Sequence, residues 1–220
     1  RVPVVARPAA KRKDFKEVLQ ILEKEQAAAE AARCLECDLM CSLCMTVCPN
    51  RAIQVYRMDP MKVELPELRV EKGRIVETGK KTFAVSQHFQ IAVFADFCNE
   101  CGNCATFCPT AGRPYQDKPR LYRKRSEFDA EKDNAFMAMR SRKGWKMLGR
   151  FGGETYEIAM EGRHLSYTSP LFHAVFDPDT LVLQKKKLTR GVTDGYLSLD
   201  PCAAMVALLR GIRGSMTYLP

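Results

Sequence analysis

This sequence lacks both a membrane-spanning segment and the common motifs of a self-sufficient enzyme. No uninterrupted apolar run reaches about 18 residues, so we expect no transmembrane helix. Neither the G-x-G-x-x-G fingerprint of dinucleotide-binding folds nor a phosphate loop ending in Gly-Lys-Ser/Thr is present. The three histidines form no H-E-x-x-H motif and no Ser/His/Asp constellation. We therefore do not expect this chain to bind a dinucleotide, or to carry out two-electron organic chemistry, by itself.

The composition allows a folded core and carries an excess of positive charge. The chain has 220 residues, of which 46% are hydrophobic, and this is enough for one domain or two small ones. Its formal net charge is +9 when the cysteines are counted as neutral. Such a balance favours an acidic partner surface or simply a set of solvated basic loops.

Cysteine is concentrated in two short runs, which contain nine of the ten cysteines. The second run reads C-x2-C-x2-C-x3-C-P, the spacing with which bacterial ferredoxins bind [4Fe-4S] clusters. The first run ends in the same C-x2-C-x3-C-P and differs only upstream. The first run comprises Cys34, Cys37, Cys41, Cys44 and Cys48, and the second comprises Cys98, Cys101, Cys104 and Cys108.

The spacing predicts that the two runs depend on each other. Three cysteines separated by two residues can wrap a loop around a compact cluster, while the fourth, which precedes a proline, is directed elsewhere. In two-cluster ferredoxins that fourth cysteine ligates the other cluster. Each predicted ligand set therefore combines both runs. The sets are Cys37, Cys41, Cys44 and Cys108 for one cluster, and Cys98, Cys101, Cys104 and Cys48 for the other.

One ligand of the first run is ambiguous, because either Cys37 or Cys34 can precede Cys41. We favour Cys37, since the smaller loop departs less from the ferredoxin pattern. Cys34 is then a spare cysteine or an alternative ligand. The tenth cysteine, Cys202, is expected to be a small buried residue.

Zinc and disulfides explain the two runs less well. Structural zinc sites usually show two C-x2-C pairs separated by a longer gap, whereas here the cysteines are packed together and each run ends in Cys-Pro. A disulfide framework needs an oxidising compartment, and no signal peptide is evident in the sequence. Soft thiolate ligands favour iron–sulfur clusters. We therefore expect a reducing cytoplasm and an oxygen-poor cell.

Hydrophobic patterns predict the elements around the cysteine runs. Residues 1–13 form a basic, proline-containing arm, and Asp14 is expected to begin a helix that continues toward the first run. Between the runs we expect a hairpin with its turn at residues 72–73, and two further short strands at 82–85 and 90–94.

The remainder of the chain is predicted to be mostly β structure. Residues 120–150 are basic and are expected to be loop-rich, as a docking face or a solvated surface. Two hairpins are expected, at 155–167 and at 172–183. Asp200 is expected to cap a final helix that ends near Gly211 or Gly214.

These patterns divide the chain into three parts and predict an α+β fold. Residues 1–33 are the basic arm and helix. Residues 34–119 form a two-[4Fe-4S] ferredoxin-like domain with a β insert. Residues 120–220 form a β-rich C-terminal region that ends in a helix.

Several stretches resemble known iron–sulfur proteins. Residues 12–37 are similar to the iron–sulfur region of glutamate synthase small-chain proteins. The segment C-N-E-C-G-N-C-A-T-F-C-P at 98–109, together with 48–52, 112–118 and 126–136, resembles more closely the C-terminal iron–sulfur module of selenate reductase-like subunits. In that family a flavin- and NAD(P)-binding region accompanies the module.

The resemblance implies that electrons pass between NAD(P)H, a flavin and a terminal oxidoreductase, often a molybdenum hydroxylase. Sites for FAD and NAD(P) would then lie on a partner chain or on a part of the protein outside this sequence. The primary hypothesis is an electron-transfer subunit with two [4Fe-4S] clusters and no catalytic residue of its own. One alternative is a catalytic reductase with a substrate site in the C-terminal region. Another is a nucleic-acid-binding iron–sulfur protein, which the basic segments motivate but which we expect less.

Overall fold

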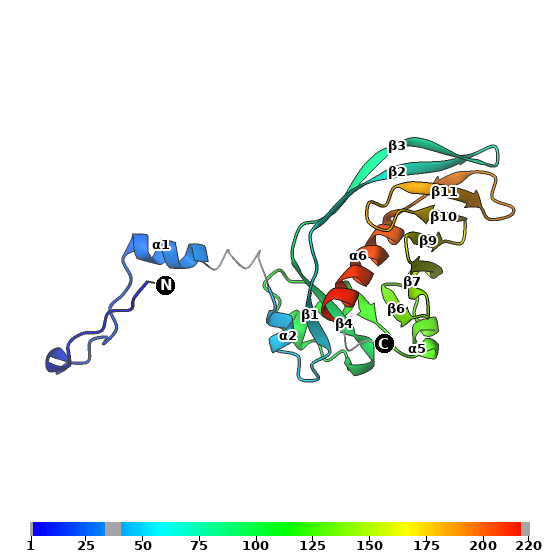
Figure 1. Cartoon of the computed structure of the whole chain (residues 1–220). Helices are drawn as coiled ribbons and strands as arrows, with labels where there is room; N and C mark the ends of the chain where they lie inside the picture. Colours follow the sequence, from blue (N-terminus) through cyan, green and yellow to red (C-terminus); the bar gives the residue numbers. More distant parts are fainter. Residues whose placement is uncertain (1, 34–40, 217–220) are drawn as a thin grey trace. The chain divides into compact units, whose positions relative to one another are not determined.

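The computed structural model describes residues 2–33 and 41–216 of the chain (Figure 1). The chain divides into two compact units, Arg1–Cys41 and Ser42–Pro220. Cys34 and Cys37, the two alternative ligands of the first run, lie outside the described residues. Within the described ranges, no helix combines the length and the hydropathy that a membrane crossing requires.

The first unit departs from the helix predicted at its start. It comprises the 3-10 turn η1 (Ala9–Lys11) and the helix α1 (Lys24–Arg33). The expected helix start at Asp14 is wrong, because its carboxylate pairs with Arg7 at 2.7 Å and accepts the Lys16 N–H at 3.2 Å. This local pairing stabilises a turn in place of a first helical turn. Phe15 is fully exposed, so this unit does not gain the burial of an apolar side chain that would stabilise a helix here.

The second unit is built on a nine-stranded mixed sheet with the order β1-β4-β5-β6-β7-β8-β9-β10-β11. The β4–β5 and β5–β6 pairs are parallel and the other pairs in this sheet are antiparallel. A smaller sheet has the order β12-β2-β3. The strands are β1 (Ile53–Arg57), β2 (Met61–Glu71), β3 (Arg74–Val85), β4 (Phe89–Phe94), β5 (Arg120–Leu121), β6 (Ala135–Arg140), β7 (Gly144–Phe151), β8 (Glu154–Glu161), β9 (His164–Thr168), β10 (Phe172–Phe176), β11 (Leu183–Leu188) and β12 (Gly195–Leu197).

Helix α6 (Asp200–Ser215) provides much of the core of this unit. It contacts β1, β7 and β8, and it lies across the large sheet in Figure 1. Cys202 is 2% exposed on this helix, which confirms that it is a buried core residue. Asp200 is the first helical residue and pairs with Lys81 at 2.7 Å, so the prediction that its side chain caps the helix is wrong. The other helices are α2 (Leu43–Thr46), η3 (Ala95–Phe97), α3 (Asn103–Thr106), α4 (Pro114–Asp117) and α5 (Arg125–Ala130).

The predicted hairpins are confirmed, although several strands are longer than expected. Lys72 and Gly73 have φ of 49° and 73°, as a two-residue turn between β2 and β3 requires. Residues 82–85 are the last four residues of β3 rather than a separate strand, and 90–94 fall within β4. Strands β8 and β9 form the next hairpin, and β10 and β11 form the last.

The prediction that residues 120–150 are loop-rich is wrong. Strands β6 and β7 form an antiparallel pair that runs from Ala135 to Arg150. Their apolar side chains belong to two different core clusters. Each strand buries consecutive residues, among them Phe136 on β6 and Met147 on β7, while Lys146 pairs with Glu157 on β8. The basic residues at 140–146 separate two apolar segments, and these segments lie in strands rather than in loops.

Candidate iron–sulfur site

Two short helices each carry one buried cysteine, and the two cysteines come from different runs. Cys44 lies on α2 and Cys104 on α3, and each is 6% exposed. The two helices contact each other. Their backbones are closed by corresponding hydrogen bonds, from Thr46 to Ser42 at 3.3 Å and from Thr106 to Gly102 at 3.0 Å. The repeated C-x2-C-x3-C-P sequence thus forms a four-residue helix twice, although the residues before the two helices differ in backbone conformation.

The Cys-Pro end of each run also forms the same sulfur contact. The N–H of Ala52 donates to Cys48 Sγ at 3.3 Å, and the N–H of Gly112 donates to Cys108 Sγ at 3.3 Å. Both Cys-Pro turns therefore direct a backbone N–H at the last sulfur of their run.

One cavity brings together cysteines from both runs. Cys48 of the first run lines it together with Cys98, Cys101 and Cys104 of the second run. Ile53 at the start of β1 lines the same cavity, and the inner cysteines pack with it in a small apolar cluster. This donor set consists of soft thiols, which suit an iron–sulfur cluster.

The environment changes the acidity of two thiols of the second run, Cys98 and Cys108, in opposite directions. Burial raises the pKa of the Cys98 thiol. The Thr110 hydroxyl, 3.4 Å from Cys108 Sγ, is the main cause that lowers the pKa of the Cys108 thiol, and the Gly112 N–H contributes to the same effect. A bound metal would favour the thiolate at both positions.

The other predicted ligand set is only partly described. Cys41 is exposed, Cys44 is buried and Cys108 is half-buried, while Cys37 lies outside the described residues. Across residues 2–33 and 41–216, no three His, Cys, Asp or Glu side chains form a group that could hold a single metal ion. The ligand assignment for this set stays a prediction.

Several residues that are not predicted ligands also line the cysteine cavity, among them Glu100 and Tyr115. Glu100 lies between two predicted ligands in the second run, so its position alone could have indicated it. Tyr115 lies on α4, which follows the second run by a few residues, and no spacing rule points to it.

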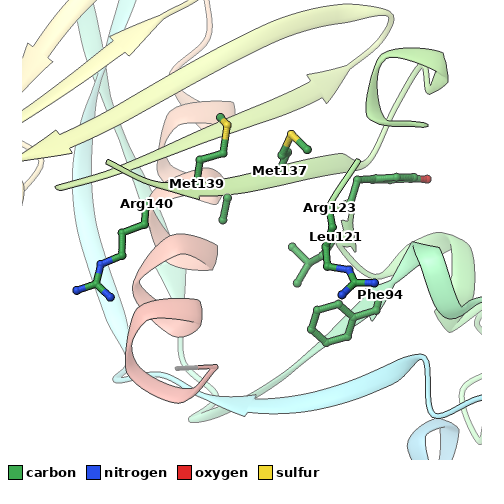
Figure 2. A pocket seen from close by; sticks show the side chains of 8 residues that line it. Phe94, Leu121, Arg123, Met137, Met139 and Arg140 are labelled. Atoms are coloured by element: carbon green, nitrogen blue, oxygen red, sulfur yellow. The ribbon is translucent and has the colours of Figure 1, made fainter. Parts of the chain in front are cut away.

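A second cavity of about 290 Å³ lies between β4, β5 and β6. Figure 2 shows its apolar wall, formed by Phe94, Leu121, Met137 and Met139. Arg123 lies at one end, where its Nε donates to Asp96 Oδ2 at 2.8 Å. This lining can accept an apolar surface, but it offers no nucleophile beside a base.

Comparisons with known proteins relate the chain to oxidoreductases over part of its length. It is 36% identical over 110 residues to the "Putative oxidoreductase YgfK" of Escherichia coli strain K12, a match that covers 50% of this chain and 8% of that protein. It is 39% identical over 72 residues to the pyruvate:ferredoxin oxidoreductase of Moorella thermoacetica, which is 32% of this chain and 6% of that protein. No family model and no solved structure matches the chain. The chain thus spans less than a tenth of either relative, and its similarity is to a part of much longer oxidoreductases.

Proposed function

We propose that this chain is an electron-transfer module that holds two [4Fe-4S] clusters. The observation that carries the proposal is the cavity in which Cys48 joins three cysteines of the other run. That combination is the ligand set that the ferredoxin spacing assigns to one cluster, with the fourth ligand supplied by the other run. The second cluster takes the predicted set Cys37, Cys41, Cys44 and Cys108.

The residues around the cysteines favour storage of charge rather than substrate chemistry. When bound, each cluster supplies a one-electron carrier. Ile53 and Val93 are buried beside the inner cysteines, and such apolar neighbours limit the access of water to a cluster. The N–H groups of Ala52 and Gly112 stabilise negative charge on sulfur. All of these groups bind or shield the cluster, and none of them is placed to transfer a proton to a substrate.

The partners follow from the same proposal. The partial similarity to two long oxidoreductases supports a role inside a larger redox assembly. Because the sequence contains no dinucleotide fingerprint, we place FAD and NAD(P) on a partner oxidoreductase subunit or on a further part of the protein. Molybdenum hydroxylase subunits are the proposed terminal partner, in the cytoplasm.

Iron analysis of the anaerobically reconstituted chain tests the proposal. Two clusters correspond to about eight iron atoms and eight acid-labile sulfides per chain. Cys98→Ser should remove about half of the iron, because it deletes one ligand of one cluster. Cys202→Ala is the matched control and should retain all of it, since Cys202 lies in the α6 core. Tightly bound zinc in place of iron, or unchanged iron in Cys98→Ser, would contradict the proposal.

A further inference from the structure

Arg120 on β5 lies between two carboxylates, one of which belongs to the second cysteine run. Its Nη2 is 3.3 Å from Glu100 Oε1, and its Nη1 is 3.2 Å from Glu131 Oε2. The Arg120 side chain is only 18% exposed, so water and salt screen its charge less than that of a free surface arginine. The positive charge of Arg120 therefore lies next to Glu100, in the second cysteine run.

The large sheet and the segment after α5 hold Arg120 in place. Glu131 accepts a hydrogen bond from the Tyr122 hydroxyl at 2.7 Å, and the Arg120 guanidinium lies 5.5 Å from the centre of the Tyr122 ring. The Arg150 side chain donates to the backbone carbonyl of Glu131 at 2.9 Å. Because Glu131 is held at both its side chain and its backbone, Arg120 is anchored from the sheet side.

Glu100 is the exposed and strained end of this network. It lines the cavity with the cysteines, and its backbone has a φ of 54°, which a residue with a side chain rarely adopts. Its side chain is about half exposed, and the structure records an ion pair between it and Arg120. The guanidinium thus pairs with a residue that lies between Cys98 and Cys101 in the sequence.

We propose that Arg120 is a positioning residue that sets the reduction potential of the cluster held by Cys48, Cys98, Cys101 and Cys104. The inference rests on the proposed function. Adding an electron makes a cluster more negative, and nearby net charge is one of the factors that set its potential. Arg120 offsets the carboxylate of Glu100 and favours the reduced form. Without Arg120, the negative charges of Glu100 and Glu131 would be uncompensated, and they would favour the oxidised form.

Redox titration of the reconstituted chain, followed by electron paramagnetic resonance, tests this inference. Arg120→Gln should make reduction of this cluster about tenfold less favourable, which lowers the midpoint potential by 59 mV for a one-electron couple. Arg120→Lys should keep the midpoint potential close to that of the unmodified chain, because lysine retains the positive charge. Glu100→Gln should shift the potential in the opposite direction. Arg125→Gln is the matched control, because Arg125 pairs with Asp129 on the exposed side of α5 and should leave the potential unchanged.

The outcomes separate this inference from the proposed function. If the unmodified chain binds no iron, the proposed function fails before any potential is measured. If the iron content is normal but Arg120→Gln matches Arg125→Gln in potential, only the role of Arg120 is wrong. A shift in the same direction for Arg120→Gln and Glu100→Gln indicates general loosening of the loop and also overturns the charge argument. Glu100→Gln changes a half-exposed side chain, so it keeps the inference testable even if Arg120→Gln does not fold.

Discussion

Arg51 and Ala111 occupy equivalent positions and share an unusual backbone conformation. Each is the third residue after the last cysteine of its run, and their φ values are 51° and 54°. This left-handed conformation costs a residue with a side chain roughly 1–2 kcal/mol, but costs glycine little. We expect Ala111→Gly to raise the free energy of unfolding by about 0.5 kcal/mol, the net of relieved strain and of the greater freedom of the unfolded chain. Urea unfolding at an unchanged m-value measures the effect.

The control for this substitution is the same chemical change in a helix. Ala207 is buried in the middle of α6. Ala207→Gly should lower the free energy of unfolding by about 1 kcal/mol, because glycine is a poor helix former. Equal losses for both variants would show that the left-handed turn stores no strain.

Cysteine spacing predicts the chemistry of the site but not the residues that surround it. It assigns Cys48 to the cluster of the second run, and Cys48 lines one cavity with Cys98, Cys101 and Cys104, while the ligand assignment itself stays a prediction. Spacing could not indicate Arg120, because its ion pair with Glu100 depends on how β5 is placed in the sheet. Long-range register of this kind is set by the packing of the whole unit, which no local motif encodes.

The fold shows the same division between local and distant causes. The turn at Lys72 and Gly73 was predictable, since the turn chemistry and the flanking strands are adjacent in sequence. The helix expected from Asp14 was wrong, because an ion pair with Arg7 competes with the helical turn. Amphipathic spacing alone does not stabilise a helix when no partner surface within its unit buries the apolar face.

Tyr167 and Tyr122 allow a test of how buried hydroxyl groups affect stability. Tyr167 is 1% exposed, and its hydroxyl has no hydrogen-bond partner among the described residues. A buried polar group without a hydrogen-bond partner destabilises the folded state by about 1–3 kcal/mol, because it has lost its contact with water. Removing the group removes this destabilisation. Tyr167→Phe should therefore raise the free energy of unfolding by about 1 kcal/mol in urea unfolding.

The opposite sign is expected where the tyrosine hydroxyl is paired. Tyr122 donates to Glu131 at 2.7 Å, so Tyr122→Phe should lower the free energy of unfolding by about 1 kcal/mol or more. A destabilised Tyr167→Phe variant would mean that the hydroxyl of Tyr167 has a partner after all.

Gly144 lies where a side chain would collide with the neighbouring strand. An added Cβ would be 2.0 Å from the Met160 carbonyl oxygen on β8. The strands would have to separate, so Gly144→Ala should lower the free energy of unfolding by about 2 kcal/mol or more. Gly214→Ala is the matched control, because nothing lies within 4 Å of its added Cβ and alanine favours the α6 helix. Thermal unfolding should place the two variants on opposite sides of the unmodified chain.

The shared cavity predicts which cysteine substitutions damage the same cluster. Cys48 lies in the first run but lines the cavity with Cys98. Cys48→Ser and Cys98→Ser should therefore leave the same residual spectrum in electron paramagnetic resonance, each with about half of the iron. Cys108→Ser should remove the other cluster and leave a different spectrum. If Cys48→Ser instead resembled Cys41→Ser, each run would bind its own cluster, and the exchange of the fourth ligand would be wrong.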